Sequence, residues 1–118
     1  MVDCGGVVFD AGEMLDDMKG PLLAASSQPE QSRDVLPHIV PYVPDVRRDI
    51  TAIRQRVVAA GFAASYPAVR DLDAMIATLG PLTAAAKAKR LDAMPKIYLD
   101  LNSALEQWTF DSRYVCAS

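Results

Sequence analysis

Side chains that could do chemistry are few in this sequence and far apart. His38 is the single histidine, so a catalytic triad or a cysteine–histidine pair would have to be built around it. It lies between Pro37 and Pro41, and no acid or nucleophile stands at a spacing that would orient its ring. We therefore expect His38 to be an exposed or interface residue, and we expect the chain not to be an enzyme.

Carboxylates occur in two close pairs, Asp16-Asp17 and Asp71/Asp73. Neighbouring residues on a helix point about 100° apart, so Asp16 and Asp17 do not converge on one ligand. Helical di-iron sites use Glu-x-x-His, which the sequence lacks. The pair Gly5-Gly6 is not followed by the Gly-Lys-Ser/Thr of a phosphate loop. The sequence thus predicts no metal and no bound cofactor, and it favours a solvated role for these acids.

The two cysteines, Cys4 and Cys116, stand at opposite ends of the chain. Zinc sites need clustered Cys and His ligands, which these residues do not provide. Because chain termini often lie close together on a domain surface, one interpretation is a disulfide that joins the two ends. Such a bond would favour an oxidising compartment. The alternative is two free thiols in a reducing compartment.

Length and composition bound the remaining possibilities. The chain has 118 residues, enough for one domain, and 51% of them are hydrophobic while 7% are aromatic, which predicts an aliphatic core. A net charge of −3 with mixed signs argues against a general nucleic-acid binder. No apolar run approaches the roughly 20 residues that span a bilayer, and the start does not resemble a signal peptide. We expect either a cytosolic protein or a mature chain whose targeting segment has been removed.

Apolar residues recur at helical spacing after Pro44, which suits the first turn of a helix. One stripe runs to about Ala60, and Gly61 is a natural stop. Ser65 and Pro67 predict the next helix start, and Gly80-Pro81 predicts its end. The two stripes consist of Val46, Ile50, Ile53 and Val57, and of Val69, Leu72, Met75, Ile76 and Leu79.

The most regular seam comes last, with spacings that alternate between three and four residues. Pro95 lies inside it, so we expect either a kink there or a break between an Ala-rich helix from about Leu82 and another from about Lys96. The seam residues are Leu91, Met94, Tyr98, Leu101, Leu105 and Trp108.

Gly and Pro punctuate the first third of the chain. A short helix is predicted from about Ala11 to Lys19, and three prolines predict that the piece from Leu36 to Tyr42 is extended. We therefore predict an all-α, antiparallel up-down bundle of three to four helices. Its parts within one domain are an irregular N-terminal segment (1–43), the helical bundle (44–110) and a tail (111–118).

Several residues are candidates for partner binding. The segment around Leu36 carries apolar side chains that need cover, while Arg47 and Arg54, seven residues apart, share one helix face. For the arginines, the alternative is a solvated face paired with nearby aspartates. For Trp108, the alternative is packing in the core seam, although aromatic and arginine residues often anchor interfaces. The full set of candidates is Leu36, His38, Ile39, Tyr42, Arg47, Arg54 and Trp108.

One family resembles this chain over about residues 44–108. Ser65-Tyr66-Pro67-Ala68-Val69 is similar to the Trp-Pro-x-Val helix start of PsbQ-like proteins, with Tyr66 where the family has tryptophan. The stretch from Arg90 to Leu105 is similar to that family's Leu-rich third helix. The resemblance implies a non-enzymatic, pigment-free extrinsic subunit of photosystem II in the chloroplast thylakoid lumen. It would dock on the photosystem core and other extrinsic subunits, peripheral to the membrane.

Two other functions stay open. The chain could be a helical adaptor or accessory subunit of another large assembly, such as a respiratory complex. It could also be a secreted helical carrier that holds a lipid or another apolar ligand between its helices.

Overall fold

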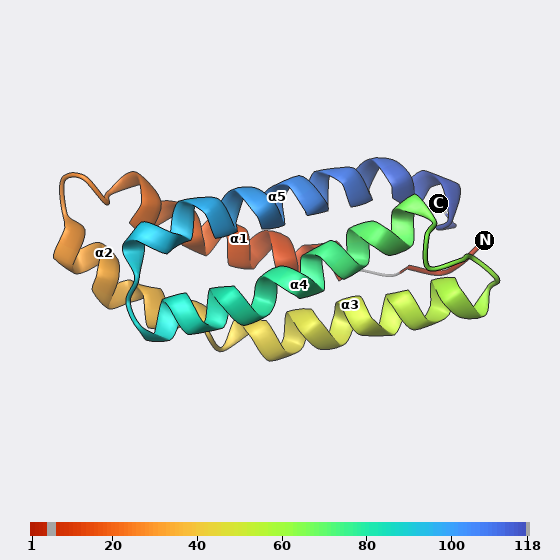
Figure 1. Cartoon of the computed structure of the whole chain (residues 1–118), viewed down its shortest axis with the longest axis horizontal. Coiled ribbons are helices and arrows are strands. Elements are labelled where there is room, and N and C mark those ends of the chain that lie inside the picture. The colour runs from red at the N-terminus through yellow and green to blue at the C-terminus, as the bar shows by residue number, and fades with distance from the viewer. Residues whose placement is uncertain (5–6, 118) are drawn as a thin grey trace.

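A computed structural model describes residues 1–4 and 7–117, without the side chains of residues 7–9. Four long helices run antiparallel to their neighbours and form an elongated bundle with principal extents of 48 × 22 × 21 Å (Figure 1). They are α1 (Val7–Leu23), α3 (Tyr42–Ala59), α4 (Pro67–Lys87) and α5 (Met94–Asp111). The short helix α2 (Pro29–Val35) lies at one end. Within the described residues the architecture is all-α, as the sequence predicts.

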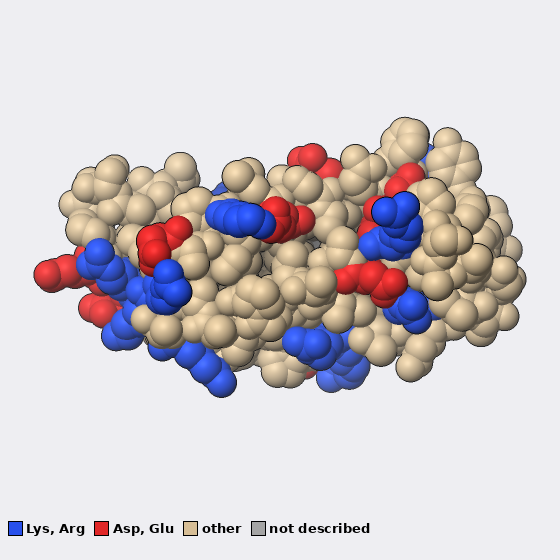
Figure 2. All heavy atoms as spheres, viewed as in Figure 1, with Lys and Arg blue, Asp and Glu red and all other residues tan. Residues whose placement is uncertain are grey.

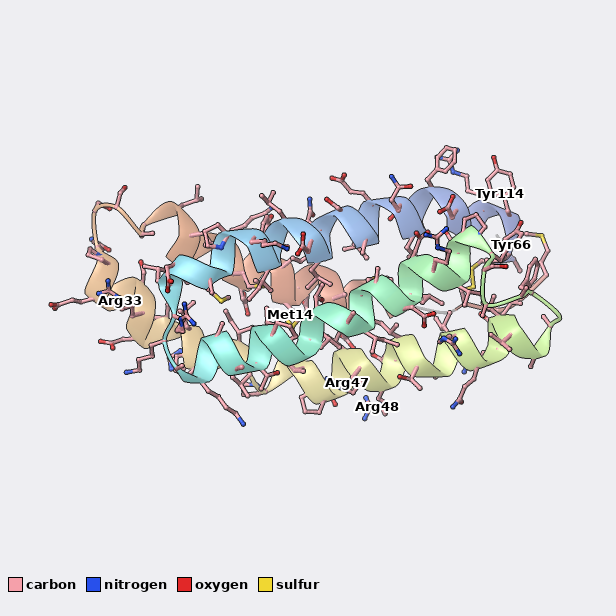
Figure 3. All side chains as sticks on the ribbon, viewed as in Figure 1. Met14, Arg33, Arg47, Arg48, Tyr66 and Tyr114 are labelled. Atoms are coloured by element: carbon pink, nitrogen blue, oxygen red, sulfur yellow. A yellow bond between two sulfur atoms is a disulfide. The ribbon has the colours of Figure 1, made fainter. Side chains whose placement is uncertain are left out.

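The core is aliphatic and sulfur-rich. Every residue of the predicted stripe on α3, from Val46 to Val57, is buried, and so are Leu72, Met75 and Leu79 on α4. Met14 and Met18 reach this core from α1, and Figure 3 shows Met14 pointing into the bundle. Packing of these apolar stripes, rather than local propensity, accounts for most of the stability of such helices.

The N-terminal third is more regular than its Gly and Pro content predicts. Helix α1 extends beyond the predicted short helix at both ends and includes Gly12, Gly20 and Pro21. Its buried residues Ala11, Met14, Leu15 and Met18 recur at helical spacing and pack against the other helices, which offsets the weak propensity. Gly5 and Gly6 lie outside the described residues.

The prediction of an extended segment from Leu36 to Tyr42 is wrong. Leu36–Ile39 forms a 3₁₀ turn (η1), and α3 begins at Tyr42. Within this turn the Pro37 carbonyl accepts a hydrogen bond from the Val40 N–H, 3.2 Å away. Proline restricts the chain here without forcing it to be extended.

The prediction that α4 ends at Gly80-Pro81 is also wrong, because the helix continues to Lys87. Leu79 and Leu82, on either side of the dipeptide, are fully buried, so core packing holds the helix together across the proline. The expected break near Pro95 exists but precedes it. The chain turns after Lys87 through a short 3₁₀ segment (η2, Leu91–Ala93), and Pro95 occupies the first turn of α5.

At the other end of the bundle, both termini lie at the same end as the loop between α3 and α4 (Figure 1). That loop contains Gly61 at φ +102°, and α4 starts with Pro67 at its first position as predicted. Ser65 does not cap α4; Tyr66 is the cap residue and its side chain makes no capping bond. The C-terminal residues continue past α5 as a 3₁₀ turn (η3, Ser112–Tyr114).

Candidate functional site

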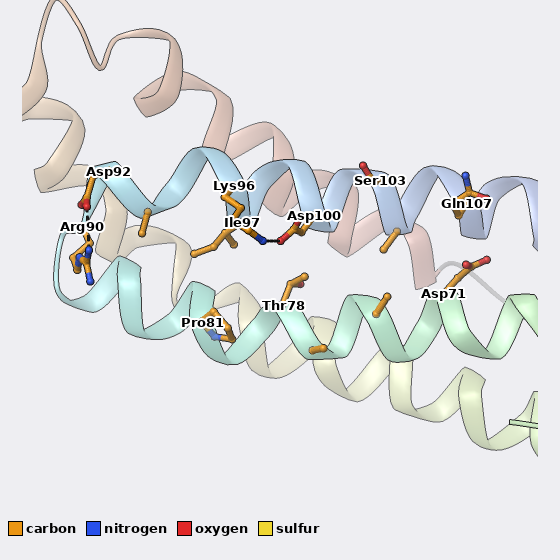
Figure 4. A pocket seen from close by; sticks show the side chains of 14 residues that line it. Asp71, Thr78, Pro81, Arg90, Asp92, Lys96, Ile97, Asp100, Ser103 and Gln107 are labelled. Carbon is orange, nitrogen blue, oxygen red and sulfur yellow. Dashed lines mark hydrogen bonds and ion pairs between the residues drawn. The ribbon is translucent and has the colours of Figure 1, made fainter. Parts of the chain in front are cut away.

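An open groove of about 920 Å³ runs along the outer surface between α4 and α5 (Figure 4). Its surface is predominantly apolar, with small residues along most of its length and charged residues at intervals along its sides. The α4 side consists of Asp71, Ala74, Ala77, Thr78 and Pro81, and the α5 side includes Ala93, Lys96, Ile97, Asp100, Ser103, Ala104 and Gln107.

The groove follows from the two-faced character of both helices. On α4 the groove residues recur every three to four positions, out of phase with the buried stripe that contains Leu72, Met75 and Leu79. The same spacing holds from Ala93, at the end of η2, to Gln107 on α5. Because several of the residues that line the groove are Ala, Ser or Thr, the two helices leave a hollow between them.

Two ion pairs line the groove, one in the turn between α4 and α5 and one on α5. The Arg90 guanidinium lies 3.0 Å from Asp92, and the Lys96 ammonium lies 2.6 Å from Asp100 (Figure 4). A hydrogen bond and the positive charge of Arg90 lower the pKa of Asp92. Each pair is internally neutral and largely exposed, so these charges shape the groove more than they stabilise the fold.

Asp71 forms the acidic end of the groove. Its Oδ2 atom is buried and accepts no hydrogen bond from the described residues. Burial, followed by a shared hydrogen bond with Asp111 and the charge of that residue, raises the pKa of Asp71 to about 7, and Arg70 opposes the shift. The carboxyl groups of Asp71, near the start of α4, and Asp111, at the end of α5, therefore interact across the two helices and favour the protonated form of Asp71.

A smaller depression of about 440 Å³ lies where the end of α1 meets the start of α5. It is almost entirely apolar, and it contains two of the most exposed large hydrophobic side chains, Leu23 at 83% and Leu99 at 60% exposure. Lys19, Leu22, Pro95 and Tyr98 complete it.

The predicted Cys4–Cys116 disulfide is confirmed, with Cα atoms 5.6 Å apart. The backbone supports the same join: the Val2 N–H donates to the Val115 carbonyl at 2.9 Å, and the Ala117 N–H donates to the Val2 carbonyl at 2.7 Å. This short parallel bridge and the disulfide fasten both termini to one end of the bundle. Disulfides of this kind belong to oxidising compartments.

Three of the residues predicted to contact partners are in the core. Leu36 and Ile39 are buried where η1 packs on α1 and α4, and Trp108 is 1% exposed. Their side chains pack the bundle and are not available to a partner in this conformation. Trp108 therefore packs in the core, as the alternative interpretation of this residue expects.

The other candidates remain at the surface but do not come together. His38 and Arg47 are exposed, and Figure 3 shows Arg47 and Arg48 pointing away from the bundle. Arg54 does not share this solvated role, because its Nε lies 2.5 Å from Asp73 on α4. The Tyr42 hydroxyl donates to Asp17 at 2.5 Å, and this bond raises the pKa of Tyr42.

The paired carboxylates of the sequence separate in the structure. Asp16 pairs with Lys19 at 3.5 Å while Asp17 accepts from Tyr42, and Asp73 pairs with Arg54 while Asp71 faces Asp111. A hydrogen bond shared with Asp49 raises the pKa of Asp10 at the α1–α3 seam, and burial and the charge of Asp49 act in the same direction. In the part of the chain that the structure describes, no group of three or more potential ligands is arranged to hold a metal ion.

Sequence reasoning missed the groove and the Asp71–Asp111 contact. These two aspartates are 40 positions apart, and alanines on a helix carry no signal of their own.

Basic and acidic side chains are interspersed on the face drawn in Figure 2. No helix among the described residues is long and apolar enough to cross a membrane. Comparisons with protein-family models, with curated proteins and with solved structures find no match to this chain.

Proposed function

We propose that this protein is a non-catalytic accessory subunit that docks on a larger protein assembly in an oxidising compartment. The observation that carries this proposal is the open, largely apolar α4–α5 groove on a bundle whose two termini are fastened together. A rigid scaffold that presents a preformed concave surface loses little conformational entropy on binding. The Cys4–Cys116 disulfide supports the oxidising compartment.

Within this class, the lumenal face of photosystem II is the assembly that we propose. The resemblance of residues 44–108 to PsbQ-like proteins supports it. The up-down arrangement of four long helices, with α1 beside α3, α4 and α5, also supports it. In this role the protein would steady or shield the oxygen-evolving centre without binding pigment. The family's docking residues cannot be transferred position by position, so the groove is the surface that we assign.

Fractionation of the source cells tests both levels of the proposal. We expect antibodies against the chain to detect it in the thylakoid lumen and in purified photosystem II cores, and to lose the core-bound fraction after a high-salt wash. Co-purification with a different assembly would contradict docking on photosystem II, but it would agree with an accessory role. Migration as a free monomer in every native fraction would contradict the accessory role itself.

The structure favours docking over the carriage of an apolar ligand between the helices. The side chains of Met14, Met18, Met75 and Met94 are fully buried in the core between the helices. Extraction of the purified protein followed by mass spectrometry tests this difference, and we expect no stoichiometric lipid.

A further inference from the structure

The α4–α5 groove has the dimensions of a helix. The α4 side spans eleven residues from Asp71 to Pro81, and the α5 side spans fifteen from Ala93 to Gln107, which are ten and fourteen helical steps. At 1.5 Å of rise per residue these stretches are about 15 and 21 Å long, which matches three to four helical turns. Its volume of about 920 Å³ lies at the upper end of the range for small-molecule sites, although the groove is open along its length.

The floor of the groove permits close approach of a backbone. Ala74 and Ala77 are exposed on α4, and Ser103 and Ala104 line the groove from α5. Small side chains between two helices let a third helix lie in the hollow at the usual 8–10 Å between axes. Half-buried Ile97 adds an apolar contact, so the occupant needs an apolar stripe.

The charges and hydrogen-bond acceptors define the polar part of the occupant. The pairs Arg90–Asp92 and Lys96–Asp100 cancel internally. The remaining carboxyl among the described residues that line the groove is Asp71, which faces the carboxyl of Asp111 and no groove cation. An occupant that brings a cationic donor to Asp71 would satisfy this end of the groove.

We propose that the α4–α5 groove binds an amphipathic α-helix of a partner protein, with its apolar stripe on Ala74, Ala77 and Ala104 and a Lys or Arg near one end placed against Asp71. This inference rests on the proposed function and names the surface and the partner element through which docking occurs. It is a helix-in-groove mode of recognition.

The test is selection of peptides on the purified, oxidised protein. The probe is a phage-displayed library of 16-residue peptides in a helix-favouring framework, with apolar and basic positions randomised. We expect the enriched peptides to carry an i, i+3, i+4, i+7 apolar stripe and a basic residue near one end. Failure to enrich helical sequences, or enrichment without a basic residue, would overturn the proposal.

Two variants locate the binding site. Ala77→Trp fills the groove at an exposed position and should weaken the selected peptides at least tenfold, while the matched control Ala59→Trp, exposed at the end of α3, should leave them unchanged. Asp71→Asn keeps the side-chain shape and should weaken basic peptides about fivefold relative to the same peptides with Gln in place of the base. Circular dichroism verifies that each variant is folded.

Other results would assign the groove differently. Equal binding to Ala77→Trp and the parent would place the peptide elsewhere, and a dimer of the pure chain that Ala77→Trp dissociates would make a second copy the occupant. Either outcome overturns the partner helix. The accessory role is decided separately, by co-purification of the parent protein from its source.

Discussion

The carboxyl of Asp71 couples the stability of the bundle to pH. Its pKa rises from 3.8 to about 7 on folding, so between about pH 4 and pH 7 the folded state holds a proton that the unfolded state has lost. The contribution of this proton to the free energy of unfolding is present in full below pH 4 and disappears as pH rises through 7. After allowance for solvent screening at a partly exposed group, we expect this contribution to be about 1–2 kcal/mol.

Asp71→Asn should remove this pH dependence. We expect the free energy of unfolding of the variant to be flatter than the parent's between pH 4 and pH 7, because the amide does not titrate. Urea unfolding at half-unit pH intervals measures the difference. Asp100→Asn, in the same groove but paired with Lys96 at the surface, is the control and should retain the parent's slope. Equal slopes for the parent and Asp71→Asn would contradict the assigned proton.

The Arg54–Asp73 pair is a close ion pair that joins α3 to α4. Both of its side chains are partly exposed, at 34% and 44%, so its contribution is modest. We expect a double-mutant cycle with Arg54→Gln and Asp73→Asn to give a coupling of about 0.5–1 kcal/mol that shrinks in 1 M salt. The control cycle is Arg48 with Asp45, both on α3, where the atoms lie 3.4 Å apart and both side chains are more exposed. A coupling energy no larger than in this control would show that the α3–α4 pair stabilises the fold no more than a pair within one helix does.

At the scale of whole elements, α1 shows that weak local propensity can yield to packing. A methyl group added at Gly12 would meet nothing within 4 Å beyond its chain neighbours, and the backbone at this position is helical. Replacing it with alanine reduces the conformational freedom of the unfolded chain, and no proline follows it to oppose a helical side chain. We expect Gly12→Ala to raise the free energy of unfolding by about 0.5–1 kcal/mol.

Gly61→Ala is the matched control for that substitution. It has the same free space around it but a φ of +102°, a conformation that alanine adopts with strain. We expect it to lower stability by about 1 kcal/mol, as chemical denaturation would measure. If both variants shifted stability in the same direction, backbone conformation would not be the deciding factor at these two sites.

The helices show how far the sequence determines the fold. Regular apolar spacing predicts α3 closely, because every stripe residue from Val46 to Val57 is buried. The same spacing predicts too short a helix for α1. There Gly20 and Pro21 lower the local helix propensity, but contacts with distant segments stabilise the helix. The groove could not be predicted, since Ala74 and Ser103 acquire meaning only when α4 and α5 lie side by side. The Asp71–Asp111 contact depends on the same pairing.

For the molecule as a whole, the disulfide is the constraint with the longest reach. Cys4 and Cys116 are separated by 112 positions, so their bond closes nearly the entire chain into one loop. In the chain-entropy model a loop of about 100 residues gains roughly 4–5 kcal/mol, because the bond restricts the unfolded state. The backbone bridge between Val2 and Cys116 holds the same ends together in the folded state.

Reduction should therefore lower stability without abolishing the fold. Because the four helices share a core that includes Ile53 and Leu72, far in sequence from the bond, we expect helical circular dichroism to persist at room temperature. The midpoint of thermal unfolding should fall by at least about 10 °C. Intact mass should rise by about two daltons on reduction as the bond opens. A Cys4→Ser/Cys116→Ser variant should have the same unfolding midpoint as the reduced parent and be insensitive to reductant. If its stability equalled that of the oxidised parent, the disulfide would not stabilise the fold.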